Sequence, residues 1–366
     1  MRKLLVVLPG IFEEEFLENI GKKSLEVFDH FYSNSEVFRL NKELKNHTNE
    51  LAYFGLNPEQ YKVQKGPLAC AAIGVTPPQR DVRFCLSLLS INDDGVIQDP
   101  VYIPGEKDLD LLLKSAEVLN TNALTMVKGR KLDHGLIWEK GSIDLHTYSK
   151  EEILNQPYDG HQPEGEGDRI LTGLIEDSIE ILSNHDINKK RQDEGLRPLN
   201  ILWPWGQGLG ISLPNLAMQS GQIAQVYSDS WMIKGISNLV SYQHIDLNNF
   251  GAGLNIAWKK LEHSISDGST SILIFDRVSQ LLNLKRPDYA ERLFQELNQE
   301  LFNKIRNLQD NIPYELMLIM TGDSGIALKE KSYIPITNNL PFSTELSQDS
   351  MIPKLNIWEL TNTFLG

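Results

Sequence analysis

Three short apolar runs, separated by longer segments of helical pattern, constrain the fold of this chain most strongly. They are Leu4 to Leu8, Ser271 to Phe275 and Leu316 to Met320. Apolar runs of this length, each bounded by turn residues, are typical of strands that are buried on both faces. An amphipathic helical pattern over residues 289–310 separates the second run from the third. Strands that alternate with helices predict an α/β fold with a mostly parallel sheet and helices on both faces.

Length, charge and cysteine content narrow the class of protein. A chain of 366 residues is long enough for two domains, or for one core with a large insertion. Its net charge of -14 argues against binding to nucleic acid or to an anionic membrane, because both need basic patches. Cys70 and Cys85 are too few for a disulfide scaffold. The apolar start before Pro9 is too short for an export signal. We therefore expect a soluble, cytoplasmic protein with no membrane contact.

A tryptophan-rich run at residues 200–210 is the most distinctive local feature. It reads Asn-Ile-Leu-Trp-Pro-Trp-Gly-Gln-Gly-Leu-Gly. We expect a strand of the core sheet whose glycine-rich end faces the edge where ligands usually bind. Trp203 and Trp205 share one face of such a strand. They either pack in the core or line a cleft together with Gln207.

The region before this run has the pattern of a smaller α+β unit. Residues 132–138 and 143–148 predict the two strands of a β-hairpin, and residues 92–95 predict a tight turn. Residues 170–182 form a clear amphipathic helix, because apolar side chains recur at helical spacing.

Three stretches together resemble the archaeal-type cofactor-independent phosphoglycerate mutases, which are members of the alkaline-phosphatase-like metalloenzyme superfamily. The first stretch comprises Leu51 to Tyr61, Lys65 to Ala69 and Arg80 to Phe84, the second is Ile181 to Asn188, and the third comprises Trp203 to Gly208 and Lys234 to Ile236. The resemblance implies an alkaline-phosphatase-like core from residues 1–58 and 196–366. An inserted smaller α+β domain would then span residues 59–195.

The metal ligands and the serine nucleophile of that family are mostly not matched in this chain. The resemblance implies two divalent metals, such as manganese or zinc, held by Asp, His and Ser side chains, with the Ser also accepting the phosphoryl group. The residues at the matching positions of this chain are Pro9, Asn46, Ser279, Asn283, Asp323 and the pair Pro335–Ile336. Only Asp323 keeps a ligand type, so we regard it as vestigial. We expect no catalytic residue, no metal site and no cofactor.

In its loss of metal ligands the chain also resembles a bacterial branch of the superfamily, whose members are described as Rpf-type regulatory proteins. The stretches Asp99 to Tyr102 and Leu273 to Arg277 resemble that branch as well.

Five residues are the candidates for ligand binding. They are Lys65, Asp81, Arg83, Trp205 and Gln207. An arginine offers a planar fork of donors for phosphate or carboxylate. The alternative for Arg83 is a structural pair with Asp81.

We therefore interpret the chain as a phosphoglycerate-mutase-like pseudoenzyme that has lost two-metal phosphoryl transfer. It would act by binding a small anionic metabolite or a protein partner, rather than as an enzyme. The alternative is an active 2,3-bisphosphoglycerate-independent phosphoglycerate mutase, or a related metal-dependent phosphotransferase, whose ligands lie elsewhere in the chain. A third reading is a regulatory module that binds only other proteins.

Overall fold

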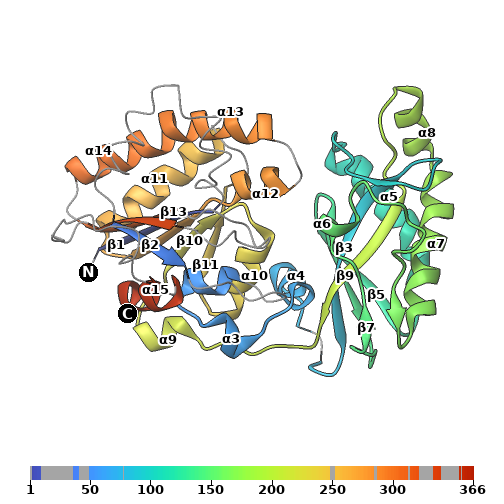
Figure 1. Ribbon diagram of the computed structural model, residues 1–366, viewed down its shortest axis with the longest axis horizontal. Helices are drawn as coiled ribbons and strands as arrows, with labels where there is room; N and C mark the ends of the chain where they lie inside the picture. Colours follow the sequence, from blue (N-terminus) through green and yellow to red (C-terminus); the bar gives the residue numbers. More distant parts are fainter. Residues whose placement is uncertain are drawn as a thin grey trace. The chain divides into compact units, whose positions relative to one another are not determined.

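A computed structural model describes residues 2–9, 36–40, 49–76, 78–247, 252–283, 287–311, 314–320, 333–338, 354–355 and 357–366. The chain divides into two compact units (Figure 1). Unit 1 comprises residues 1–62 and 213–366, and unit 2 comprises residues 63–212. The expected position of Asn46 and that of Asp323 lie outside the described residues.

Unit 1 is built on a mostly parallel sheet with the strand order β11-β10-β12-β1-β13-β14-β2-β15. The strands are β1 (Lys3–Leu8), β2 (Glu36–Leu40), β10 (Gln225–Ser228), β11 (Gln243–Asp246), β12 (Thr270–Ile274), β13 (Glu315–Met320), β14 (Tyr333–Asn338) and β15 (Lys354–Leu355). The three apolar runs of the sequence form adjacent parallel strands, because β1 pairs with both β12 and β13. The predicted α/β class with a mostly parallel sheet is confirmed.

Helices cover both faces of this sheet, as Figure 1 shows. One layer contains α11 (Ala252–Ser266), α13 (Pro287–Leu297) and α14 (Asn303–Asn311), and its side chains share one apolar core with Leu4, Val6 and Leu273. The other face carries α10 (Trp231–Leu239) and α15 (Ile357–Leu365). The remaining elements are η1 (Asn49–Phe54), α3 (Pro58–Tyr61), α9 (Leu216–Ser220), α12 (Arg277–Asn283) and a π-helical turn η3 (Asn298–Phe302).

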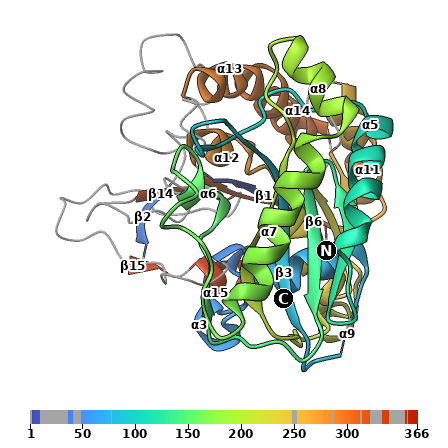
Figure 2. The same cartoon turned by 90° about the vertical axis from the view of Figure 1, so that its right-hand side faces the viewer.

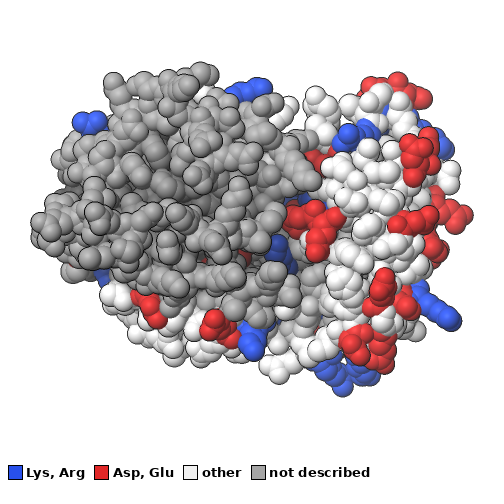
Figure 3. Space-filling view, viewed as in Figure 1, with Lys and Arg blue, Asp and Glu red and all other residues white. Residues whose placement is uncertain are grey.

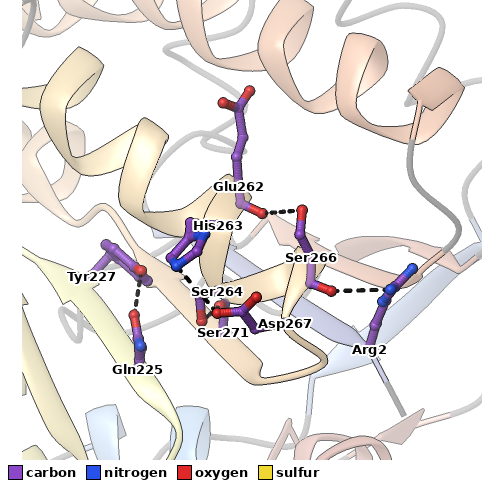
Figure 4. A network of polar contacts seen from close by, with 9 residues as sticks. All are labelled: Arg2, Gln225, Tyr227, Glu262, His263, Ser264, Ser266, Asp267 and Ser271. Atoms are coloured by element: carbon purple, nitrogen blue, oxygen red, sulfur yellow. Dashed lines mark hydrogen bonds and ion pairs between the residues drawn. The ribbon is translucent and has the colours of Figure 1, made fainter.

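Polar contacts tie the end of α11 to the sheet of unit 1 (Figure 4). The guanidinium of Arg2 donates to the carbonyl oxygen of Ser266 at 3.0 Å. Ser271 on β12 donates to the hydroxyl of Ser264 at 3.2 Å, and both side chains are buried. A buried hydroxyl needs such a partner, so this pair fixes the register of α11 against β12.

Unit 2 is an antiparallel sheet with helices on both faces. Its sheet has the order β4-β3-β6-β5, and β9 pairs with β3. The strands are β3 (Val82–Ile91), β4 (Ile97–Gln98), β5 (Leu124–Arg130), β6 (Asp133–Trp138) and β9 (Ile201–Gly208), with a separate pair β7 (Leu145–His146) and β8 (Glu164–Gly165). The helices are α4 (Lys65–Ile73), α5 (Glu106–Ala116), η2 (Glu117–Leu119), α6 (Lys150–Ile153), α7 (Asp168–Ser183) and α8 (Asp186–Asp193).

One face of the unit 2 sheet packs against α5 and α7, which face the viewer in Figure 2. Leu112, Leu171 and Leu174 from these helices share a core with Phe84 and Leu136 of the sheet. The predicted amphipathic helix over residues 170–182 is confirmed as α7. Acidic and basic side chains are interspersed on the part of unit 2 that is visible in Figure 3.

The tryptophan-rich strand lies in unit 2, and our assignment of it to the parallel core was wrong. β9 pairs antiparallel with β3, with Trp205 opposite Cys85 and Trp203 opposite Ser87. Pro204 fits here because β9 is paired on one side only, and an edge strand tolerates a missing N–H. The boundary expected after residue 195 therefore moves to residue 212. The start of the insertion falls at residue 63 instead of 59.

The hairpin predicted from residues 132–138 and 143–148 does not form. β6 pairs with β5 and β3, whereas β7 pairs with β8. The turn predicted at residues 92–95 does connect β3 to β4.

Candidate site on the sheet of unit 2

The face of the unit 2 sheet opposite α5 and α7 carries the candidate functional site. Helix α4 packs on this face so closely that a Cβ on Gly66 would lie 2.2 Å from the carbonyl oxygen of Arg83 and 2.8 Å from that of Gly206. Only glycine permits this approach. The register of β3 against β9 shifts between Arg83 and Cys85, at the same place. The first residue of α4, Lys65, is thereby placed above β9.

Lys65 and Trp205 form a cation–π pair. The Nζ of Lys65 lies 5.3 Å from the centroid of the Trp205 ring, and the indole is 6% exposed. An ammonium group over an indole is held by the negative face of the ring. This contact holds the Lys65 ammonium over the Trp205 ring.

A chain of polar contacts leads from Trp205 to a second lysine. The indole Nε1 donates to Ser87 Oγ at 3.0 Å, and Ser87 Oγ donates to Asp133 Oδ1 at 3.4 Å. Lys150 Nζ lies 3.9 Å from the same oxygen of Asp133. We call Lys65, Ser87, Asp133, Lys150 and Trp205 the Lys65–Lys150 site.

β9 also holds the segment that carries Lys150. The amide of Gln207 accepts a hydrogen bond of 2.5 Å from Thr147 and donates to the carbonyl oxygen of Leu145. Trp203 Nε1 donates to the carbonyl oxygen of Tyr148 at 2.8 Å. Two side chains of one strand thus fix residues 145–148, and Lys150 follows directly as the first residue of α6.

A capping box begins α6 and completes the placement of Lys150. The Ser149 hydroxyl accepts from the N–H of Glu152, whose carboxylate accepts from the N–H of Ser149. Such reciprocal bonds satisfy donors that the start of a helix leaves open.

Both lysines interact electrostatically with the Cys85 thiol. Burial raises the pKa of Cys85 well above its ordinary value, and the nearby Lys65 ammonium opposes that rise. The Asp133 carboxylate is the largest cause of the raised pKa of Lys150, to which Cys85 also contributes. Lys150 is therefore charged at neutral pH.

The thiols themselves offer little chemistry. Burial raises the pKa of Cys70 to about 11, and the pKa of Cys85 is also raised. Because the thiolate is the nucleophile, both cysteines are poorly reactive near neutral pH. The site therefore offers ammonium groups that can bind an anion, rather than a thiol that can attack one.

Two of the residues predicted from the sequence, Lys65 and Trp205, belong to this site, and Gln207 supports it. Arg83 and Asp81 make other contacts. The buried Arg83 guanidinium donates to the carbonyl oxygen of Pro78 at 3.5 Å and packs against Gly210, and burial is the main cause of its lowered pKa. Asp81 accepts a hydrogen bond of 3.1 Å from the N–H of Lys140. Both stabilise the turn before β3.

Sequence analysis missed Ser87, Asp133 and Lys150. They come from β3, β6 and α6, and no local motif joins them. The only sequence signal for Lys150 is the Ser149–Glu152 spacing of the capping box, which predicts a helix start rather than a binding residue.

The described residues of unit 1 do not fit the two-metal ligand set that the resemblance implies. Pro9 is buried directly after β1, and Ser279 is buried in α12. A proline has no side-chain ligand atom, and a carboxylate is replaced by a hydroxyl at residue 279. Within the described part of the chain, no group of three or more His, Cys, Asp or Glu residues is placed to hold a metal ion. The helices described there are all too short or too polar to cross a membrane.

Comparison with known proteins relates the chain to one family by sequence. The family profile for 2,3-bisphosphoglycerate-independent phosphoglycerate mutase matches residues 42–188. A mutase of that name from Methanothrix thermoacetophila is 26% identical over 202 residues, which are 54% of this chain and 50% of the relative. Another from Methanosarcina acetivorans is 29% identical over 192 residues, covering 51% of this chain and 47% of the relative. The chain thus spans about half the length of these relatives.

The comparisons contradict our expectation that the protein has no cofactor. The relatives are cofactor-independent phosphoglycerate mutases, a family that depends on divalent metals. The relationship therefore gives no basis for a metal-free protein, although the described residues do not supply the family's ligand set.

Solved structures support the same relationship at the level of the fold. A protein of Pyrococcus horikoshii aligns with a TM-score of 0.63 at 15% identity, covering 92% of this chain and 87% of that protein. The cofactor-independent phosphoglycerate mutase of Thermoplasma acidophilum aligns with a TM-score of 0.51 at 14% identity, covering 100% of this chain and 97% of that one. The chain is therefore related to the archaeal-type cofactor-independent phosphoglycerate mutases and shares their α/β fold.

Proposed function

We propose that this phosphoglycerate-mutase-like protein binds a small anionic metabolite at the Lys65–Lys150 site and does not carry out mutase turnover. The observation that carries the proposal is the chain of contacts on one face of unit 2 that joins Lys65 to Lys150 through Trp205, Ser87 and Asp133. A charged donor to a phosphate or carboxylate forms a stronger hydrogen bond than a neutral one. A phosphorylated carboxylate of three carbons, the class named by the relatives, is the ligand we favour.

We propose the absence of turnover because the residues at the family's metal-ligand positions are of the wrong chemical type. The family places an Asp after the first strand, where this chain has Pro9, and an Asp and a His where it has Ser279 and Asn283. Carboxylate and imidazole groups are the ligands that hold two metals in place for an in-line displacement. Binding of the metabolite would then serve sensing or regulation.

Titration calorimetry with 3-phosphoglycerate, with and without manganese, tests the binding half of this proposal. We expect saturable binding with one site per chain. A mutase assay on the same preparation, loaded with manganese and with zinc, tests the second half. We expect no interconversion of 3-phosphoglycerate and 2-phosphoglycerate above the background of a protein-free control.

An active mutase is the second candidate, because both sequence relatives quoted above carry that name. Turnover that depends on added metal and is abolished by Asp323→Ala would establish it. That result would refute the pseudoenzyme reading, while leaving the Lys65–Lys150 site as a candidate for substrate binding.

A further inference from the structure

We infer that Asp133 selects, among small anions, those that also carry a hydrogen-bond donor, such as a hydroxyl or an ammonium group, beside the anionic group. This inference rests on the proposed function, because it names the ligand class of the same site. It assigns a specificity role to a carboxylate that lies among the cations.

Asp133 lies within the Lys65–Lys150 site. It begins β6 and pairs with Ser87 of β3 in the sheet register. Ser87 receives the Trp205 indole hydrogen, and Trp205 carries the Lys65 ammonium over its ring. Asp133 is thus separated from the Lys65–Trp205 pair by a single hydroxyl group.

The two carboxylate oxygens of Asp133 make unequal contacts. Oδ1 accepts from Ser87 at 3.4 Å and is the oxygen nearest Lys150. Within the described residues the Asp133 side chain makes its polar contacts through Oδ1, and the side chain remains 45% exposed. An ionised carboxylate accepts hydrogen bonds on both oxygens. Oδ2 is therefore the acceptor that an arriving ligand can use.

Lys150 is only loosely paired with Asp133. Its Nζ is 3.9 Å from Asp133 Oδ1, which is longer than a hydrogen bond. The lysine side chain is 19% exposed. Lys150 can therefore move its hydrogen bonds to a ligand anion without breaking a short ion pair.

Together these features define the ligand. A simple anion gains from Lys65 and Lys150 but is repelled by the Asp133 carboxylate. A ligand with a donor on the neighbouring carbon offsets that repulsion, because it donates to Oδ2 while its anionic group faces the lysines. Hydroxy acids and amino acids that bear a phosphate or a second carboxylate have this geometry.

The test compares two ligands that differ by one hydroxyl group. One is 3-phosphoglycerate, and the other is 3-phosphonooxypropanoate, which lacks the 2-hydroxyl. Titration calorimetry is carried out with the intact protein, with Asp133→Asn and with Lys150→Met. The Asn side chain preserves size and keeps an oxygen for Ser87, but it turns its amide hydrogens toward the ligand.

We expect the wild-type protein to bind the hydroxylated ligand about tenfold more tightly or better, as for a hydrogen bond to a charged group. In Asp133→Asn this preference falls to about twofold or less, while the affinity for the deoxy ligand rises. In Lys150→Met both affinities fall together and the preference is kept. That control separates Asp133 from a general loss of the site.

Equal affinities of the wild-type protein for the two ligands would overturn the inference while the proposed function stands. An unchanged preference in Asp133→Asn would do the same. If neither ligand binds to the wild-type protein, the proposed function fails, and the inference fails with it. Circular dichroism of each variant confirms that unit 2 is folded before its affinities are compared.

Discussion

The indole nitrogen of Trp205 donates a hydrogen bond of 3.0 Å to the hydroxyl of Ser87, and both groups are buried in unit 2. This bond fixes the rotation of the indole. Its face consequently points to Lys65, whose ammonium lies 5.3 Å from the ring centroid. One buried hydrogen bond therefore orients the aromatic surface of the candidate site.

Trp205→Phe removes this bond and tests the role of the indole. We expect the free energy of unfolding to fall by about 1–3 kcal/mol, because Ser87 loses its donor and the smaller ring leaves a gap. Affinity for 3-phosphoglycerate should fall about threefold, because a phenyl ring holds an ammonium less firmly than an indole.

The matched control is Trp231→Phe in unit 1, where Lys234 Nζ lies 5.9 Å from the Trp231 ring centroid. It removes the same atoms from a similar pair. Affinity should stay unchanged there. A loss of affinity in Trp231→Phe equal to that in Trp205→Phe would contradict the placement of the site.

Gly66→Ala tests the close packing of α4 on β3 and β9. An added Cβ would lie 2.2 Å from the backbone oxygen of Arg83, so α4 must shift away from the sheet. We expect the free energy of unfolding, measured in urea, to fall by about 3 kcal/mol or more, or the protein not to fold.

Gly173→Ala in α7 is the control, because a Cβ there meets no atom within 4 Å. That change should stabilise the protein by about 0.5–1 kcal/mol. Equal effects of the two changes would refute the packing argument.

The parallel core could be predicted from sequence because its pattern is local. The runs at Leu4–Leu8 and Ser271–Phe275 show continuous apolar character, and β1 and β12 pair in parallel as expected. For the same reason the tryptophan-rich run was assigned to the wrong sheet. A strand that is buried on both faces shows the same continuous apolar sequence in a parallel sheet and in an antiparallel one. The sequence of β9 therefore does not reveal that it pairs antiparallel with β3.

The candidate site was only partly predictable because its residues depend on tertiary pairing. Lys65 and Trp205 stand in recognisable motifs. Asp133 lies in the first of two segments that were predicted to form a hairpin with one another, and Lys150 lies two residues after the second. In the structure β6 pairs with β3 instead, and this pairing brings Asp133 to Ser87. No pattern of nearby residues contains that information.

Because the imidazole of His134 is buried, we expect the protein to lose stability at acid pH. It is 2% exposed, and its Nδ1 accepts a hydrogen bond of 3.1 Å from the N–H of Gly129. Burial, opposed in part by Asp133, lowers the pKa of His134 to about 4 from an ordinary value of 6.5. The unfolded chain therefore binds more protons than the folded chain between these two values, and stability falls as pH drops through this window.

Between pH 7.5 and pH 5 this one residue should remove about 2 kcal/mol from the free energy of unfolding. Urea unfolding of the wild-type protein and of His134→Phe at both pH values measures it. The difference between the two pH values should shrink by that amount in the variant. Identical pH dependence in both proteins would show that His134 is not held neutral by burial.

Gln207→Leu tests whether β9 positions Lys150. The change removes both bonds that the amide makes to residues 145 and 147. We expect amide hydrogen exchange in residues 145–150 to speed up about tenfold or more, while exchange in α7 stays as in the wild-type protein. Affinity for 3-phosphoglycerate should fall as well, because Lys150 is less well held. Unchanged exchange in residues 145–150 would assign the placement of Lys150 to the capping box alone.

The central claim is that two lysines of unit 2 hold a small anion, and calorimetric titration of lysine variants tests it most directly. Lys65→Met and Lys150→Met keep the aliphatic stem and remove the charge. Lys128→Met is the control, because it removes the same charge from a lysine outside the site. Lys128 pairs at 2.6 Å with Asp110 of α5, which packs on the opposite face of the unit 2 sheet. We predict that 3-phosphoglycerate binds the first two variants about tenfold or more weakly and the control as tightly as the wild-type protein. Equal affinity of all four proteins, or no binding by any of them, would contradict the account.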